Sequence, residues 1–254
     1  MKTINLPYKN IHKGYLILVN EKYPYYEEPE RTDLKPVNTL DLNILLEQRT
    51  VEFLAHTMKE INGWQQICAV SGWRSLQEQE KIYSQSMLDH GLVFTQQFVA
   101  LPGHSEHPTG LAVDLGMRKE EIDFIRPEFP YTGICKIFRQ SSPRYGFIER
   151  YPNGKEHITG IAHEPWHFRY VGYPHAAIMK EKDFCLEEYI NFLKQFLYGK
   201  TPYIWETESR NIAISYIAAN ANGSDTQFQI AEDVSYFISG NNVDGYIITE
   251  WRRA

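Results

Sequence analysis

Residues 105–114 read Ser-Glu-His-Pro-Thr-Gly-Leu-Ala-Val-Asp and predict a tight turn followed by a short strand. The Pro-Thr-Gly step is a turn signal, so we expect the backbone to reverse direction just after His107. The apolar residues that follow predict a strand over 111–115 that carries Asp114. This reversal brings the imidazole of His107 beside the carboxylate of Asp114, and a nitrogen and oxygen pair of this kind suits zinc.

A second stretch, residues 163–167, reads His-Glu-Pro-Trp-His and formally satisfies the HExxH pattern of helical zinc proteases. That pattern depends on a helix, where residues four apart lie on one face. Here the flanking segments are expected to be strands, and Pro165 would break the interior of a helix. In an extended chain His163 and His167 would stand about 13 Å apart at ~3.3 Å per residue, which strains joint binding of one ion. The sequence disfavours the helical interpretation without excluding it.

The favoured interpretation takes only His167 from this stretch as a metal ligand. His107, Asp114 and His167 then leave the fourth position of a tetrahedral zinc for water, which is the arrangement of a catalytic site. Glu164 is expected to be the base that takes a proton from that water and later passes it to the leaving amine. Trp166 is expected to help fix the turn that brings Glu164 and His167 to one centre.

A third stretch, residues 71–79, reads Ser-Gly-Trp-Arg-Ser-Leu-Gln-Glu-Gln and places Arg74 at a strand-to-helix turn. A guanidinium in that position can donate to a carbonyl oxygen that gains negative charge, or to a terminal carboxylate. Taken alone this signal is weak, because most arginines beside turns are solvated.

Together the three stretches resemble the zinc D-alanyl-D-alanine peptidases, the family that includes VanX, VanY and VanXY. The family pattern is S-G-[YW]-R-S-x-x-x-Q, then S-x-H-x-x-G-x-A-x-D, then E-x-W-H, in that order. The matching stretches here are SGWRSLQEQ at 71–79, SEHPTGLAVD at 105–114 and EPWH at 164–167, with RYP at 150–152, ITGI at 158–161 and FRYVG at 168–172 around them. The resemblance therefore spans most of the chain.

The resemblance implies the same site as the chemical argument. The metal ligands of the family fall on His107, Asp114 and His167, and its catalytic base falls on Glu164. Arg74 falls on the residue that stabilises the transition-state oxygen. The implied cofactor is Zn²⁺, and the implied activity is that of a metallopeptidase.

The resemblance also implies substrate contacts and a subgroup. Ser105 and Gln79 fall on positions that contact the C-terminal end of the substrate. Trp166, which lies between the expected base and the expected ligand His167, is a further candidate substrate-binding residue with a positioning role. The chain looks closest to the VanXY group, with the VanG-type variant as the candidate subtype; this group removes both free D-Ala-D-Ala and the terminal D-Ala of cell-wall precursor pentapeptides in vancomycin resistance. An aromatic- and proline-rich segment over 115–131 is a candidate lid that chooses between the two substrates.

Two other functions stay open. An L-alanyl-D-glutamate endopeptidase is a related enzyme, although phage lysins of that kind usually carry basic wall-binding repeats, which this acidic chain lacks. Hedgehog signalling domains share a related zinc site, so a non-catalytic zinc-containing binding module is the alternative of a different class. Glu164 and Arg74 favour an enzyme, because a structural ion needs neither.

Composition limits the classes of binding partner and the cellular compartment that we expect for this protein. The 254 residues carry a formal net charge of −6 and no long run of Lys or Arg, so neither nucleic acid nor an anionic membrane is expected as a partner. No stretch approaches the ~18 consecutive apolar residues of a membrane span, and no signal peptide is recognisable. Three widely spaced cysteines without a CxxC pair favour reduced thiols. We therefore expect a cytoplasmic protein, and the resemblance implies that it acts on small peptides.

Short strands that alternate irregularly with helices predict an α+β fold. We expect a small antiparallel sheet with flanking helices that carries the zinc site, plus a small β-rich C-terminal appendage. The expected strands are 15–19, 66–71, 111–115, 147–149, 158–162 and 168–171. The expected helices are 37–62, 75–91, 132–139 and 175–196, and 92–100 is a further apolar segment.

The sequence changes character near residue 201. IAISYIAA at 212–219 and TQFQIA at 226–231 look like the two arms of a hairpin, and two later apolar stretches supply more strands. We expect residues 1–200 to form the catalytic domain and residues 201–254 a small accessory unit.

Overall fold

The computed structural model describes two compact units. The described residues are 1–27, 29–207 and 210–253. The larger unit is Val19–Cys185, and the smaller joins Met1–Leu18 to the C-terminal part that begins at Leu186. This division differs from the expected boundary at residue 200, because the first strand of the chain pairs with a strand near its end. The role of each unit is still a proposal.

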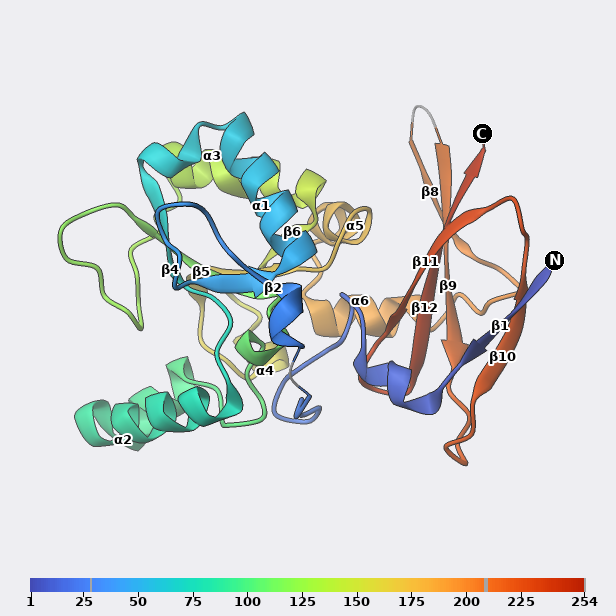
Figure 1. The fold of residues 1–254 in the computed structure, drawn as a ribbon, viewed down its shortest axis with the longest axis horizontal. Helices are drawn as coiled ribbons and strands as arrows, with labels where there is room; N and C mark the ends of the chain where they lie inside the picture. The colour runs from blue at the N-terminus through green and yellow to red at the C-terminus, as the bar shows by residue number, and fades with distance from the viewer. Residues whose placement is uncertain (28, 208–209, 254) are drawn as a thin grey trace. The chain divides into compact units, whose positions relative to one another are not determined.

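The larger unit is built on a four-stranded antiparallel sheet in the order β4-β5-β7-β6 (Figure 1). Its strands are β4 (Ile67–Ser71), β5 (Ala112–Met117), β7 (Glu164–Tyr170) and β6 (Phe147–Tyr151). The central strands β5 and β7 are buried along nearly their whole length, even though β7 carries the charged or polar side chains of Glu164, His167 and Arg169. A two-stranded ribbon of β2 (Leu34–Pro36) and β3 (Leu45–Glu47) precedes the first helix. The expected α+β class is confirmed.

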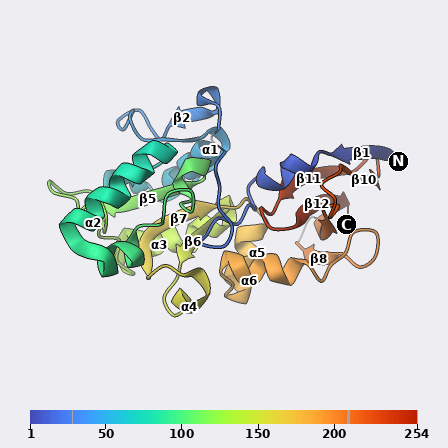
Figure 2. The same cartoon turned by 90° about the horizontal axis from the view of Figure 1, so that it is seen from below.

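Helices cover both sides of this sheet. They are α1 (Gln48–Glu60), α2 (Leu76–Phe98), α3 (Gly133–Ser141), α4 (Glu156–Thr159) and α5 (His175–Lys182). The helices α1 and α3 lie side by side on one side, and α2 lies on the other (Figures 1 and 2). The start of α2 is a complete capping box: the Ser75 hydroxyl accepts from the Glu78 backbone N–H, and the Glu78 carboxylate accepts from that of Ser75.

Several expected elements are wrong in type or extent. The apolar segment 92–100 continues α2 beyond Gly91, whose φ of 77° marks a kink. The strand expected over 158–162 is instead the end of the short helix α4 and the turn after it. The expected helix over 37–62 begins only at Gln48, because β3 precedes it. Short apolar runs fit either a strand or a buried helix, so periodicity could not separate them.

Two further corrections concern the chain near the unit boundaries. The single helix expected over 175–196 is two helices, α5 and α6 (Leu186–Leu193), because Asp183 adopts a left-handed backbone with φ of 52° and ends α5. Residues 15–19 form no strand, although Leu16 to Val19 are buried. The Leu16 N–H donates to the Ser239 hydroxyl instead of to a strand partner. These residues are therefore buried without forming the hydrogen-bonded ladder of a β-sheet.

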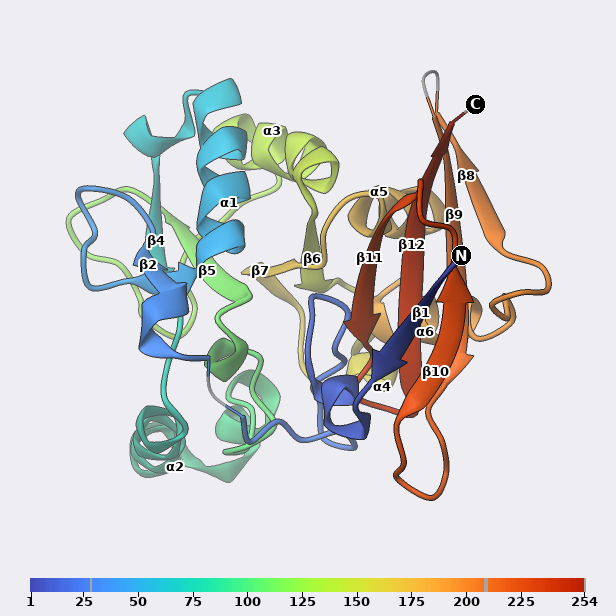
Figure 3. The ribbon, with the colours of Figure 1, turned by 45° about the vertical axis from the view of Figure 1, so that its right-hand side comes forward.

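The smaller unit is mainly β-structure and also contains α6 and the 3-10 turn Tyr8–His12 (Figure 3). One sheet has the order β11-β12-β9-β8, and a second pairs β1 with β10. The strands are β1 (Lys2–Leu6), β8 (Tyr203–Glu206), β9 (Arg210–Ala218), β10 (Thr226–Ile230), β11 (Ser235–Gly240) and β12 (Gly245–Arg253). The expected hairpin of 212–219 with 226–231 is wrong, because β9 pairs with β12 and β8 while β10 pairs with β1.

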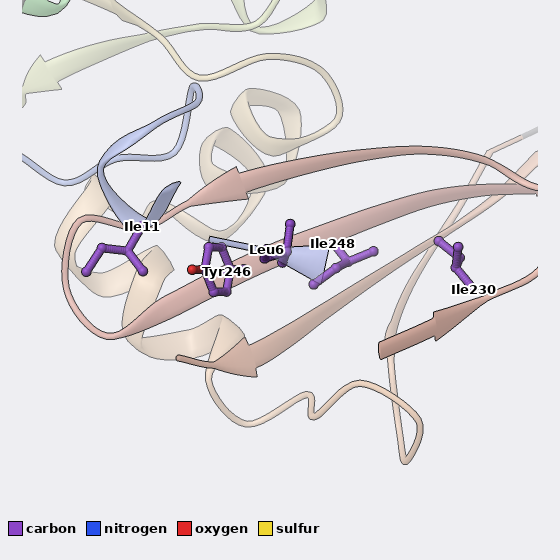
Figure 4. Packing of buried hydrophobic residues seen from close by; sticks show 5 residues of the cluster. All are labelled: Leu6, Ile11, Ile230, Tyr246 and Ile248. Atoms are coloured by element: carbon purple, nitrogen blue, oxygen red, sulfur yellow. The ribbon is translucent and has the colours of Figure 1, made fainter. Parts of the chain in front are cut away.

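A common apolar core joins the two sheets of the smaller unit. Figure 4 shows Leu6 of β1 and Ile230 of β10 in one cluster with Tyr246 and Ile248 of β12 and with Ile11. A two-stranded ribbon is marginal alone, so burial against β12 is what stabilises β1 and β10. Across the described part of the chain, no helix combines the length and the apolar character that crossing a membrane requires.

Candidate active site

The register of the central strand pair places Asp114 directly opposite His167. Asp114 on β5 and His167 on β7 are antiparallel partners, and such partners have Cβ atoms about 4.5–5.5 Å apart. The Nδ1 atom of His167 lies 2.9 Å from Asp114 Oδ1. Both side chains are buried, with 4% and 9% of their surface exposed. Strand pairing therefore joins two residues that are far apart in the sequence.

The turn before β5 delivers His107 to the same point. The backbone from His107 to Thr109 forms one 3-10 turn that ends at Gly110, where φ is 73°. A Cβ on Gly110 would stand only 3.0 Å from the backbone nitrogen of Glu47, so both conformation and space favour glycine. The Nδ1 atom of His107 donates to the carbonyl of Gly72 at 2.7 Å, and its Nε2 lies 3.2 Å from Asp114 Oδ2. The predicted reversal is confirmed.

These three side chains form a group that can hold a metal ion. One ligand atom from each of His107, Asp114 and His167 lies within 4.8 Å of the others, and all three residues are buried. The bond from His107 to the Gly72 carbonyl requires a proton on Nδ1, which leaves a lone pair on Nε2 toward the group. Two imidazoles and a carboxylate are the donor types of a three-ligand catalytic metal site.

Glu164 lies beside this group as the first residue of β7. Its Oε2 atom is 3.7 Å from His167 Nδ1, and the residue is 5% exposed. Burial raises the pKa of Glu164 to about 8 in the metal-free protein, with the negative charge of Asp114 adding to the effect and His167 and Arg74 opposing it. A buried carboxyl group with a pKa near neutrality is suited to proton transfer.

The other histidine of the HExxH-like stretch does not join the group. His163 Nε2 lies 2.7 Å from the hydroxyl of Tyr131, and the Pro165 carbonyl accepts from Arg139 Nη2 at 2.5 Å. Residues 164–170 are a strand, so the two histidines cannot lie on one helical face. The helical protease interpretation is therefore wrong, and the extended one is confirmed.

The remaining expected site residues line one small cavity with the group. The lining includes Arg74, Gln79, Ser105 and Trp166, and the cavity has a volume of about 50 Å³. Among the described residues, the buried atoms Arg74 Nε and Gln79 Oε1 have no hydrogen-bond partner. Gln79 Nε2 donates to the Ala100 carbonyl at 2.9 Å, which fixes Oε1 as the acceptor that is left. The structure thus brings together every residue that the sequence selected, and their roles are proposals.

Only part of the candidate lid borders this cavity. Phe124 and Ile125 line it. Phe129 is 2% exposed and packs edge-to-face against Phe138 and Phe168, so it belongs to the core of the unit. Any lid function is therefore confined to the residues around Phe124.

Sequence reasoning missed a charged cluster that touches the site. Glu106 Oε1 accepts from Arg150 Nε at 2.7 Å and from Arg169 Nη1 at 2.6 Å, and none of the three side chains is exposed. Burial alone would raise the pKa of Glu106, but the two positive charges outweigh it and hold the pKa far below the usual range. The available signals were the place of Glu106 beside His107 and the two arginines in the RYP and FRYVG stretches.

The matching family model and a matching relative of this chain are both D-alanyl-D-alanine peptidases. The sequence model of the VanY family, D-alanyl-D-alanine carboxypeptidase, matches residues 44–173. The bifunctional D-Ala-D-Ala dipeptidase and carboxypeptidase VanXYC of Enterococcus gallinarum is 39% identical over 71% of this chain and 95% of its own length.

Two solved structures extend this similarity. The vancomycin-resistance D,D-dipeptidase VanXYg, in complex with a D-Ala-D-Ala phosphinate analogue, is 48% identical over 99% of both chains, with a TM-score of 0.95. A variant of the D,D-pentapeptidase VanY from a VanB-type resistance cassette, in complex with Zn(II), is 29% identical over 70% of this chain and 99% of that chain, with a TM-score of 0.58. On these matches the chain belongs to the VanY family of D-alanyl-D-alanine peptidases, the family that its three sequence motifs predicted.

Proposed function

We propose that this chain is a zinc-dependent D,D-peptidase that hydrolyses free D-Ala-D-Ala and removes the C-terminal D-Ala of peptidoglycan-precursor pentapeptides, as in vancomycin resistance. The observation that carries this proposal is the buried group of His107, Asp114 and His167 with Glu164 beside it. Both activities appear in the name of the relative VanXYC, and the structural neighbour VanXYg binds an analogue of the dipeptide.

The donor set fits zinc. His107 Nε2, an oxygen of Asp114 and His167 Nδ1 would hold the ion, because these atoms face one another in the buried group. The Nδ1 atom of His107 is occupied by the Gly72 carbonyl, so its ring is already turned for this task. Bound zinc supplies Lewis acidity, which polarises the scissile carbonyl and lowers the pKa of water.

The side chains around the group divide the remaining work. Glu164, which lies beside the group, takes the proton of the attacking water and returns it to the leaving amine. Arg74 donates to the carbonyl oxygen as negative charge develops on it. Ser105 and Gln79 bind the C-terminal end of the substrate, and Trp166 positions the segment between the base and His167. All of these residues line the same cavity.

The direct test is release of D-alanine by the purified protein from D-Ala-D-Ala and from a muramyl pentapeptide. We expect release from both, loss of it on chelation and recovery on addition of zinc. An L-Ala-D-Glu-containing peptide is the control substrate and should not be cleaved. If the protein cleaves only the L-Ala-D-Glu bond of that control, the endopeptidase replaces the proposal. If it binds zinc stoichiometrically but cleaves none of the peptides, a binding module is favoured.

Zinc binding is expected to weaken as the pH falls. Burial opposes the charged form of His167, but the hydrogen bond to Asp114 and the nearby carboxylate of Glu106 outweigh it and raise the pKa of His167 to about 9 in the metal-free protein. Zinc needs the neutral imidazole, so below that pKa it must displace a proton, and Kd should rise about tenfold per pH unit of acidification. His107 adds no slope above pH 5, because burial chiefly lowers its pKa to about 4.

This prediction is checked by titrating the metal-free protein with zinc against a competing chelator at several pH values between about 5.5 and 8, with the chelator's own protonation accounted for. If Kd did not change with pH, His167 would not be a zinc ligand that carries a displaceable proton in the metal-free protein.

We also propose a cytoplasmic location and small peptides as the molecules that the protein binds. The buried thiols of Cys68, Cys135 and Cys185 support a reducing compartment. The accessory role of the C-terminal part belongs to the same proposal, because every residue assigned to catalysis lies in the larger unit.

A further inference from the structure

Glu106 is a buried carboxylate whose two oxygens have different surroundings. Its Oε1 atom accepts from Arg150 Nε at 2.7 Å and from Arg169 Nη1 at 2.6 Å. The side chains of all three residues are fully buried. A charge in this position is stable only if it is paired and well hydrogen-bonded, and both arginines converge on the same oxygen. That convergence fixes the rotation of the carboxylate.

The second oxygen points toward the proposed metal centre. Glu106 Oε2 lies 3.6 Å from Nε2 of His167. Within the part of the chain that the structure describes, neither of these buried atoms has a hydrogen-bond partner. Buried polar atoms are rarely left in that state, and the gap exceeds the usual N–H···O distance by only a few tenths of an ångström. The two atoms are natural partners once the imidazole is fixed.

We propose that Glu106 is a positioning residue of the metal centre, whose Oε2 accepts the N–H of His167 Nε2 and so turns the lone pair of Nδ1 toward the ion. The inference rests on the proposed zinc site. A histidine that binds a metal through one ring nitrogen usually donates its other N–H to a carboxylate or carbonyl, which fixes both tautomer and orientation. Arg150 and Arg169 act through Glu106 by holding its carboxylate in place.

The other imidazole is oriented on the same principle. His107 donates from Nδ1 to the Gly72 carbonyl and presents Nε2, whereas His167 donates from Nε2 to Glu106 and presents Nδ1. Because they donate from different ring nitrogens, the two histidines require opposite tautomers. Their rings meet nearly edge to face, at 86°. Neutralising the two arginines does not by itself require Glu106 Oε2 to lie beside the proposed metal ligand His167.

The tautomer can be measured on the wild-type protein. In long-range ¹⁵N–¹H spectra of the zinc-loaded protein, we expect His167 to carry its proton on Nε2 and His107 to carry its proton on Nδ1. A spectrum in which His167 is protonated on Nδ1 would overturn the inference. This measurement needs no substitution, so it decides the question even if a variant fails to fold.

Glu106→Gln tests the same contact by reversing one hydrogen bond. The amide oxygen still accepts from the arginines, but the NH₂ group now faces His167 Nε2 and favours the tautomer with the proton on Nδ1. We expect Kd for zinc, measured by chelator competition, to rise about 10- to 100-fold. Glu60→Gln is the matched control, because it removes the same charge from a pair with Arg144 elsewhere in the unit, and it should bind zinc as the wild type does.

The outcomes separate this inference from the proposed function. If the wild type binds zinc and folded Glu106→Gln binds it equally well, Glu106 only neutralises the arginines and the inference falls while the zinc peptidase stands. If the wild type binds no zinc, the proposed function and this inference fall together.

Discussion

Replacement of Glu164 by alanine is expected to lower kcat for D-Ala-D-Ala hydrolysis by about 10²–10⁴-fold while the protein still binds one zinc ion. The carboxylate is not one of the three clustered ligand positions, although its Oε2 lies 3.7 Å from His167 Nδ1. The substitution therefore removes the group that transfers the proton and leaves the metal ligands in place. D-alanine release and zinc stoichiometry, measured on the same sample, check both halves of the prediction.

The loss of activity should not come from unfolding. The pKa of Glu164 is raised by burial to about 8 in the metal-free fold, so near pH 7 the folded state binds a proton that the unfolded state releases. Stability contributed by this group therefore falls as the pH rises from the unfolded pKa through the folded one. We expect Glu164→Ala to unfold at the same temperature as the wild type or a higher one. Glu164→Gln, which keeps the shape, is the second variant, and wild-type rates in either would refute the base assignment.

Replacement of His107 by alanine is expected to abolish both zinc binding and peptidase activity. The ligand supplies one of three protein donors, so zinc affinity should fall by more than the ~10- to 100-fold that outer-shell substitutions cost. Chelator competition measures the affinity, and D-alanine release measures the activity.

His163→Ala is the matched control for that variant. His163 belongs to the HExxH-like stretch, but its Nε2 contacts the Tyr131 hydroxyl and not the ligand group. We expect His163→Ala to keep full zinc stoichiometry and activity within a few-fold of the wild type. If His163→Ala lost zinc and His107→Ala retained it, the assignment of His107 as a metal ligand and of His163 as a non-ligand would be wrong.

Local interactions explain which features could be predicted from the sequence. The turn after His107 depends on Pro-Thr-Gly, and the start of α2 depends on Ser75 and Glu78, so each is specified by neighbours along the chain. Pro165 likewise excluded a helix at the second motif, and β7 confirms this. These local signals placed the three motifs from which the candidate site residues were chosen, but not the cluster around Glu106.

Elements whose type depends on burial were predicted less well. The apolar run 92–100 was assigned no type and the segment 158–162 was expected to be a strand, but packing of the larger unit makes them the end of a helix and a short turn of helix. Helix α5 ends at Asp183 without a Gly or Pro, so no stop signal in the sequence predicts that two helices replace one.

The sequence by itself determined the donor types, the local reversal that joins His107 to Asp114, and the family. Only the tertiary structure decided that Asp114 pairs with His167, that Glu106 lies between two arginines and a ligand, and that β1 pairs with β10. These contacts join residues distant along the chain, and strand register is fixed by the side chains that the whole unit buries. No local pattern contains that information, because the free energy that selects such a pairing arises only when the core is assembled.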